Sequence, residues 1–363
     1  MMPYRSHPIL LEFSALFRSI HLIFESITRI IGSNFGAVYF CTAYYKENEE
    51  KKLSLVLKKI QKDENYNPCE SLLIKKLYFT PSFLGSCHHG DYFYLLMKNT
   101  GNTLYNIYRY KTVPIDHFKI FLRSVLSILI HFQENNAVHG DIKPSNITIS
   151  DEGVITIIDF GFGFYMGDSI SEQLMSGSLQ TSYVDILGIE GKSTYRTDLY
   201  AMGITSLYLL KGKEMNTNAY VKNIRGGGYV IDKNEYIIEF KKYVSSALIS
   251  IECEIVRNVI LMMLASSCDY VIDENEMNNT QLTTASMCLD VLMHSFIDDS
   301  LVEKSGDSLV EKSGNSLVDN SGDILITSSD SNPTLIFPYL IDLEDENSDN
   351  CKILDSVSIL GSP

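Results

Sequence analysis

The sequence contains no tryptophan and no pair of cysteines with the CxxC spacing. Its seven cysteines are an odd number and lie scattered over 363 residues, which fits neither a disulfide framework nor a zinc site. We therefore expect reduced thiols and a cytoplasmic or nuclear location. The composition is otherwise that of a globular protein, with 45% hydrophobic and 21% charged residues.

Basic residues are few relative to acidic ones. The chain has 30 Lys and Arg against 45 Asp and Glu, which gives a formal net charge of -15. This balance argues against a general affinity for nucleic acids or anionic membranes, so no direct nucleic-acid binding is expected.

Long uninterrupted apolar runs are also missing. The stretch "ILLEFSALFRSIHLIF" near the N-terminus is broken by Glu12, Arg18 and His21, so it predicts neither a signal peptide nor a membrane span. We expect residues 1–27 to form a helical extension packed on the folded domain. A helix lying on a membrane surface is the alternative, which the small number of basic residues disfavours.

The end of the chain has an unusual composition. Three octads, "SLVEKSGD", "SLVEKSGN" and "SLVDNSGD", begin at Ser300, Ser308 and Ser316, and a period of eight fits neither a heptad nor a solenoid repeat. From Ser300 onward there are twelve acidic residues and three lysines, so more than half of the net charge lies here. We expect residues 299–363 to be a disordered, acidic, Ser-rich tail, either a solvated appendage or a regulatory segment.

Residues 28–298 alternate apolar runs with turn signals, as one compact domain would. The first part holds the strand candidates "SITRIIG", "GAVYFCTAYY", "KLSLVLKKI" and "YFYLLMKN". After about residue 103 the pattern becomes helical, as in "FKIFLRSVLSILIHFQENN" and "TDLYAMGITSLYLLKGKE". The sequence predicts an α+β fold, with a small β-rich lobe over about 28–97 and a larger α-helical lobe over about 101–298. Such an architecture places a nucleotide between its lobes.

Two short motifs carry the chemistry. Residues 138–146 read "VHGDIKPSN", and "DFG" begins thirteen positions after Asn146. In this pattern Asp141 would accept or orient the proton of a substrate hydroxyl, and Lys143 would lie over the transferring phosphate as a point charge. Asn146 and Asp159 offer hard oxygen ligands of the kind that Mg²⁺ prefers. These residue types point to phosphoryl transfer from ATP.

In this order and at this spacing, the motifs resemble the catalytic loop and metal-binding motif of protein kinases. The resemblance implies the bilobal kinase fold, ATP and Mg²⁺ as cofactors, and protein substrates. It also implies that Lys58 in "LVLKK" binds the α- and β-phosphates and that Glu70 pairs with it. Lys59 is the alternative lysine, which strand alternation would turn outward. Glu64 is the alternative glutamate, but Pro68 follows it and precedes the predicted helix.

The stretch "IIGSNFGAVYF" resembles the Gly-rich loop of kinases, with Gly32, Gly36 and Val38 in place. The usual GxGxxG is not intact: either one residue fewer lies between the outer glycines, or Ser33 or Asn34 replaces a glycine. Glycine is used there because backbone amides must approach the phosphates closely, so a loss of nucleotide affinity would follow.

Two further stretches resemble the group of casein kinase I and the vaccinia-related kinases, and the form "HGDIKPSN" looks closest to the poxvirus-type kinases. "LLMKNTGNTLYNIY" is similar to the hinge of this group, which implies Met97 as gatekeeper and backbone groups of Lys98 to Thr100 as contacts for adenine. "GSLQTSYVDILGIEGKSTYRTDLYAMG" is similar to its activation segment. There Ser178 would replace the usual threonine, and Asp198 would anchor the catalytic loop.

The resemblance also has departures. Gly140 stands where casein kinase I has Arg, so no guanidinium at this position would clamp a phosphorylated activation loop. Activity independent of loop phosphorylation is therefore implied. The basic pair expected further on is reduced to Lys192 and Arg196, which leaves a preference for acidic or primed substrates open.

The leading hypothesis is a monomeric serine/threonine protein kinase. Its tail serines at 300, 308 and 316, each followed three residues later by Glu or Asp, would be autophosphorylated. A pseudokinase scaffold that binds partners or nucleotide without turnover is the second hypothesis, motivated by the altered Gly-rich loop. A small-molecule kinase of the aminoglycoside or choline type also uses "HGD", but Lys143, Pro144 and the activation segment disfavour it.

Overall fold

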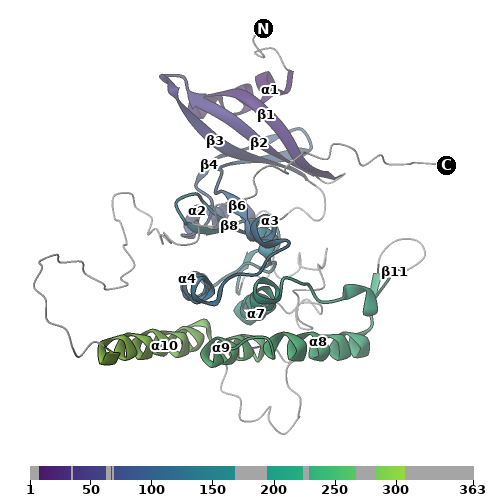
Figure 1. Ribbon diagram of the computed structural model, residues 1–363. Coiled ribbons are helices and arrows are strands. Elements are labelled where there is room, and N and C mark those ends of the chain that lie inside the picture. The colour runs from purple at the N-terminus through teal and green to yellow at the C-terminus, as the bar shows by residue number, and fades with distance from the viewer. Residues whose placement is uncertain are drawn as a thin grey trace, which may run out of the picture.

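The computed structural model describes residues 8–33, 36–62, 67, 69–167, 194–223, 229–266 and 283–306. Figure 1 shows a twisted sheet in one lobe and a mainly helical second lobe. Among the described helices, none is both long enough and apolar enough to cross a membrane.

The first lobe is built on a five-stranded antiparallel sheet with the order β1-β2-β3-β5-β4. The strands are β1 (Leu22–Ser33), β2 (Gly36–Tyr45), β3 (Asn48–Gln61), β4 (Phe83–His89) and β5 (Tyr92–Lys98). The short helix α2 (Glu70–Lys76) lies between β3 and β4 in the chain. Three of the four strand candidates in the sequence correspond closely to β2, β3 and β5, and "SITRIIG" is the second half of β1.

The N-terminal segment packs on this sheet. Helix α1 (Pro8–Leu16) contributes Phe13 to a core shared with β1, β2, β3 and β5, and Phe17, between α1 and the 3₁₀ turn η1 (Arg18–Ile20), belongs to the same core. Phe13 is 2% exposed and makes edge contacts with the rings of Phe24, Tyr39 and Tyr94. Phe13 and Phe17, two of the apolar residues of this run, are thus buried against the sheet.

The expected helical extension over residues 1–27 differs from the structure at its end. Residues 22–27 belong to β1, since Leu22 pairs with Tyr45 and Ile27 with Cys41. The apolar run that predicted a single helix therefore forms a helix, a 3₁₀ turn and the start of a strand. His21 makes the break, because its φ of 56° is a left-handed conformation that ends the 3₁₀ turn.

The second lobe begins after β5 with short elements that carry the catalytic loop. They are β6 (Asn102–Thr103), α3 (Leu104–Tyr108), β7 (Ala137–Val138), η2 (Pro144–Asn146), β8 (Ile147–Ile149), β9 (Ile155–Ile157) and β10 (Phe164–Tyr165). Strands β6, β8 and β9 form one small sheet, and β7 pairs with β10. The long helix α4 (Ile115–Glu134) lies between α3 and β7 in the chain and buries an apolar stripe that includes Phe121, Leu122, Val125 and Phe132.

Longer helices complete this lobe. Helix α7 (Tyr195–Lys211) is almost entirely buried at its centre and is followed by η4 (Thr217–Ala219), β11 (Val221–Asn223), β12 (Tyr229–Ile231), α8 (Lys233–Leu248) and α9 (Glu254–Leu264). The last described helix, α10 (Ala285–Gly306), packs against α4 and α9 (Figure 1).

Helix α10 crosses the boundary expected between domain and tail at residues 298 and 299. The first octad supplies Leu301, Glu303 and Lys304, which are good helix formers, and α10 ends at Gly306. The other two octads and the rest of the expected tail lie outside the described residues.

Candidate active site

The catalytic loop runs between β7 and β8 and holds three of the motif residues together. Asp141 is 8% exposed, and its Oδ2 atom lies 2.7 Å from Nζ of Lys143. The side-chain amide of Asn146 donates to the same Oδ2 and to the backbone carbonyl of Asp141, both at 2.9 Å. One carboxylate oxygen thus meets a cation and an amide donor, and its position is closely fixed.

Asp198 anchors the backbone at the start of the catalytic loop. It lies in the first turn of α7, is 2% exposed, and accepts hydrogen bonds from the backbone N–H groups of His139 at 2.7 Å and Gly140 at 2.8 Å. Gly140 has a φ of 76°, a left-handed conformation in which a side chain would be strained. The anchoring contact predicted for Asp198 is confirmed.

His139 connects the catalytic loop to the strand that leads to Asp159. Its Nδ1 accepts from the backbone N–H of Asp141 at 3.1 Å, and its Nε2 lies 3.0 Å from the carbonyl oxygen of Ile158, to which it donates. These partners require the neutral ring with hydrogen on Nε2. Burial lowers the pKa of His139 to about 4, so the ring stays neutral at physiological pH.

Asp159 follows β9 after one residue, Ile158, and its side chain reaches toward the first lobe. The backbone N–H of Ile158 donates to the carbonyl of Asn146 at 2.9 Å, which ties the two metal-binding candidates together. Asp159 itself has a φ of 67°, a conformation that is costly for a non-glycine residue and that clusters at functional sites. Its side chain is 46% exposed, and Oδ1 lies 2.7 Å from Nζ of Lys58.

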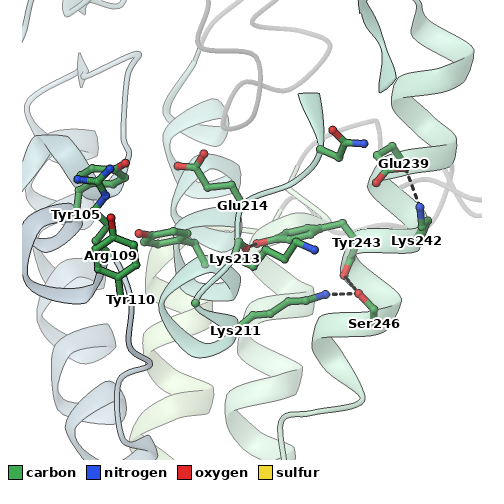
Figure 2. A pocket seen from close by; sticks show the side chains of 13 residues that line it. Tyr105, Arg109, Tyr110, Lys211, Lys213, Glu214, Glu239, Lys242, Tyr243 and Ser246 are labelled. Carbon is green, nitrogen blue, oxygen red and sulfur yellow. Dashed lines mark hydrogen bonds and ion pairs between the residues drawn. The ribbon is translucent and has the colours of Figure 1, made fainter. Parts of the chain in front are cut away.

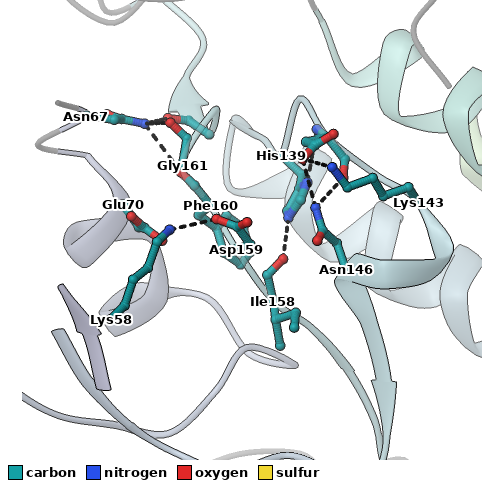
Figure 3. Close-up of polar contacts among 12 residues, drawn as sticks. Lys58, Asn67, Glu70, His139, Lys143, Asn146, Ile158, Asp159, Phe160 and Gly161 are labelled. Atoms are coloured by element: carbon teal, nitrogen blue, oxygen red, sulfur yellow. Dashed lines mark hydrogen bonds and ion pairs between the residues drawn. The ribbon is translucent and has the colours of Figure 1, made fainter. Parts of the chain in front are cut away.

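Lys58 is the cation that joins the two lobes. Besides Asp159, its Nζ contacts Oε1 of Glu70 at 2.6 Å, and Glu70 is the first residue of α2 (Figure 3). Lys59 points to the opposite face of the sheet, where its ammonium lies 3.9 Å from the centre of the Tyr92 ring. Strand alternation therefore separates the two lysines as predicted.

The charged side chains of this site shift one another's pKa values. Burial alone would lower the pKa of Lys58, but the carboxylates of Asp159 and Glu70 raise it above its usual value. The Lys58 ammonium holds the pKa of Asp159 well below its usual range. Burial raises the pKa of Asp141 to about 6, and the neighbouring Lys143 opposes this rise. Asp159 is therefore ionised throughout the physiological range, while Asp141 titrates near its acid end.

The glycine-rich stretch forms the turn between β1 and β2. Gly32 pairs with Ala37 and Ser33 pairs with Gly36, so only residues 34 and 35, which lie outside the described residues, connect the strands. At Gly36 an added Cβ would lie 2.4 Å from the carbonyl oxygen of Lys59, so only glycine fits against β3. Val38 pairs directly with Lys58 and shares its face of the sheet, beside the charged cluster.

The predicted hinge follows β5. Met97 is buried at the end of the strand, between Val56 of β3 and Phe83 of β4. The backbone N–H of Lys98 donates to Ser82 and that of Asn99 donates to Ser54, at 3.0 and 2.9 Å. These two amides are therefore engaged within the protein, so the expected adenine contacts are the carbonyls of Lys98 and Asn99 and the backbone of Thr100.

A magnesium ion would find oxygen ligands from Asn146 and Asp159 on adjoining segments of the cleft. In the described ranges no three His, Cys, Asp or Glu side chains form a metal-binding group. Two protein oxygens suit Mg²⁺, which completes its octahedron with water and substrate phosphates. The donor set thus fits Mg²⁺ delivered with a nucleotide and does not fit a metal caged by protein alone.

Some predicted site residues cannot be placed, and one residue of the site had not been predicted. Ser178 and Lys192 lie outside the described residues. The unexpected residue is Asn67, whose side chain contacts the backbone after Asp159 (Figure 3). Its position just before the predicted helix is the only signal in the sequence, and many loop asparagines share it.

A cavity of about 720 Å³ lies in the helical lobe between α3, the end of α7 and α8 (Figure 2). Its lining combines cations and tyrosines, among them Tyr105, Arg109, Tyr208, Lys211, Lys213 and Tyr243. None of the catalytic-loop residues lines it, so it is separate from the cleft described above.

Comparison with known proteins agrees with the geometry. Residues 26–288, from β1 into α10, match the protein kinase domain, and the chain therefore belongs to the protein kinase family. The small β-rich lobe and the larger helical lobe are the kinase fold predicted from the sequence.

Individual relatives are distant. The chain is 26% identical over 154 residues to serine/threonine-protein kinase PSK2 of Saccharomyces cerevisiae, covering 41% of the chain and 14% of the yeast protein. It is 28% identical over 142 residues to C03B1.5 of Caenorhabditis elegans, provisionally named a tyrosine-protein kinase, covering 36% of the chain and 42% of that protein. It is 36% identical over 95 residues to serine/threonine-protein kinase F of Synechocystis, covering 25% of the chain and 19% of that protein. The matched part spans less than half of each relative.

Proposed function

We propose that this protein transfers the γ-phosphoryl group of ATP to serine and threonine hydroxyls of protein substrates. The observation that carries the proposal is the cluster in which Lys58 joins Glu70 to Asp159 while Lys143 and Asn146 hold Asp141. Every residue type that phosphoryl transfer needs is present, and each lies beside its partner.

The cleft residues divide the work as follows. Lys58, held by Glu70, binds the α- and β-phosphates of ATP through its ammonium. Asp141 accepts a hydrogen bond from the substrate hydroxyl and takes its proton as the oxygen bonds to the γ-phosphorus and ADP leaves. Lys143 compensates the charge that gathers on the transferring group.

Metal and adenine binding complete the arrangement. Asn146 and Asp159 would hold magnesium, which neutralises the phosphates and orients the terminal one. The carbonyls of Lys98 and Asn99 and the Thr100 backbone would bind adenine beneath Gly32, Gly36 and Val38, with Met97 lining the back of its site.

The choice of serine and threonine rests on relatives. PSK2 and kinase F carry that specificity in their names, whereas C03B1.5 is named for tyrosine. The hinge and activation-segment resemblance to casein kinase I and the vaccinia-related kinases supports the same assignment. A reducing cytoplasmic or nuclear location, a monomer and autophosphorylated tail serines belong to this proposal as well.

Independence from loop phosphorylation is the second part of the proposal. At Gly140 there is no guanidinium to receive a loop phosphate, and Asp198 binds the backbone there directly. We expect activity to persist after phosphatase treatment.

The experiment is transfer of labelled phosphate from Mg-ATP to casein, to a basic protein and to the chain itself. Wild type is compared with Asp159→Asn after phosphatase treatment, and the labelled residue is identified by acid hydrolysis. We expect phosphoserine or phosphothreonine with wild type and none with the variant. Phosphotyrosine alone would overturn the specificity, and label that needs prior phosphorylation would overturn the independence.

Nucleotide binding without turnover remains a second candidate because of one observation. Gly32 and Gly36 are separated by three residues, one fewer than the four that separate the outer glycines in a full GxGxxG turn. Saturable ATP binding with no label on any acceptor would establish this scaffold function in place of transfer.

A further inference from the structure

Asn67 links the two segments whose relative position decides whether the cleft is assembled. It lies between β3 and α2 and is partly buried. Its Nδ2 donates to the carbonyl oxygens of Phe160 at 3.3 Å, Gly161 at 3.1 Å and Gly163 at 2.7 Å. Since Nδ2 has two hydrogens, the three carbonyls share them, and the Gly163 bond is the shortest.

The other end of the same amide holds helix α2. Oδ1 of Asn67 accepts from the backbone N–H of Cys69 at 2.9 Å, a local turn that asparagine favours. Cys69 is the N-cap of α2, and its carbonyl accepts from Leu72 and Leu73. Its side chain gives the helix no cap, so Asn67 fixes the helix start one residue before Glu70.

The segment that Asn67 holds has little freedom to lie elsewhere. Phe160 is fully buried, with ring contacts to Phe132 and His139. At Gly163 an added Cβ would lie 2.7 Å from Cδ1 of Leu73, so α2 packs directly on this turn. The turn and the helix therefore meet by packing as well as through the Asn67 amide.

We infer that Asn67 is a positioning residue that latches α2 to the turn after Asp159 and so keeps Glu70, Lys58 and Asp159 in contact. The inference rests on the proposed phosphoryl transfer for its catalytic consequence. The latch carries no charge and binds backbone atoms, so it requires neither a phosphate nor a particular protonation state. It supplies a physical reason for activity without loop phosphorylation.

The decisive variant is Asn67→Asp, which has the same shape and keeps the acceptor for Cys69 but removes both donors. Amide exchange of the full-length protein is followed by mass spectrometry, together with kcat, the KM for ATP and the thermal midpoint. We expect exchange in residues 160–166 to accelerate about tenfold, while exchange in residues 69–76 stays close to that of wild type. We also expect kcat to fall about tenfold with a smaller change in KM.

Two further variants complete the test. Asn67→Ala removes the acceptor too, so exchange should accelerate in both segments. Asn234→Ala, at an exposed position early in α8, is the matched control and should change neither exchange nor kcat. The latch would be overturned if Asn67→Asp had the amide exchange and kcat of wild type. It would also be overturned if amide exchange in this variant accelerated evenly over the whole chain.

The exchange result separates this inference from the proposed function. If wild type transfers no phosphate, the catalytic proposal fails, but local acceleration in Asn67→Asp still supports the latch. If wild type is active and Asn67→Asp matches it in both readouts, the latch fails and the catalytic proposal stands. Should Asn67→Ala fail to fold, the shape-conserving aspartate variant decides alone.

Discussion

The Nζ atom of Lys143 lies 2.7 Å from Oδ2 of Asp141, inside a pocket that nearly excludes water from the carboxylate. Burial raises the pKa of Asp141 to about 6, and the ammonium of Lys143 limits that rise. The proton affinity of the catalytic base is thus a balance between desolvation and one cation.

This balance predicts the pH dependence of the reaction. Because Asp141 must be ionised to accept a proton, kcat/KM should rise with pH through about 6, where an ordinary aspartate would already be ionised. Lys143→Ala removes the opposing cation and should move this limb to higher pH, in addition to lowering the rate. Initial rates between pH 5 and 8 measure both effects, and a wild-type limb near 4 would contradict the prediction.

The same shift predicts a stability cost at the active site. The folded-state pKa of Asp141 lies above its unfolded value, so its contribution to stability is complete below about 4 and is lost as pH rises through about 6. Asp141→Asn should therefore unfold with a free energy up to about 3 kcal/mol higher than wild type at pH 7. Urea unfolding at pH 5 and pH 7 tests this, since the difference should shrink at the lower pH.

Lys58 and Lys59 form a matched pair on opposite faces of one strand. Lys58→Met removes the cation between Glu70 and Asp159, and kcat/KM should fall about 100-fold or more. Lys59→Met removes contacts with the rings of Tyr92 and Tyr94, away from the charged cluster, and kcat/KM should stay within about twofold of wild type. Steady-state kinetics of both variants test this prediction. Equal losses of kcat/KM would show that a positive charge on this strand matters and that its position does not.

Asp198 should matter for both folding and rate. Asp198→Asn replaces one acceptor oxygen by a donor facing the buried backbone of the catalytic loop, which should lower the free energy of unfolding by about 2 kcal/mol. Activity should fall as well, because the backbone of His139 and Gly140 would be released and these residues directly precede Asp141. Asp116→Asn, on the exposed first turn of α4, is the control and should cost less than about 0.5 kcal/mol. Denaturant unfolding compares the two.

The packing of α1 on the sheet is tested with two phenylalanines. Phe13→Ala should lower the free energy of unfolding by about 3 kcal/mol, because the buried ring leaves a cavity among three aromatic neighbours. Phe40 is 44% exposed, and Phe40→Ala should cost less than about 1 kcal/mol. Equal effects would mean that α1 is not part of the folded lobe.

The residues of the cleft were predictable because each has a fixed place in a short motif. Asp141, Lys143 and Asn146 lie within one loop, and Asp159 follows a clear apolar strand. Glu70 was predictable as the start of a helix. Its pairing with Lys58, across 12 residues, followed from the resemblance to kinases and could not follow from the pattern alone.

The features that sequence reasoning missed depend on contacts with distant residues. Strand β4, "FLGSCHH", has no β-branched residue and exists because it pairs with β5. The switch from η1 to β1 after His21 is set by pairing with β2. The role of Asn67 depends on carbonyls more than ninety residues away, and nothing next to it in the sequence indicates them.

The burial of Phe160 has a consequence for inhibitors. Compounds that occupy the space of this ring can bind only after it leaves the contacts with Phe132 and His139, and that displacement also breaks the carbonyl bonds to Asn67. Their apparent affinity is reduced by the small fraction of molecules in which the site is vacant. Compounds that bind while Phe160 stays in its buried position carry no such penalty. Asn67→Asp should therefore narrow the difference in apparent affinity between the two classes of compound.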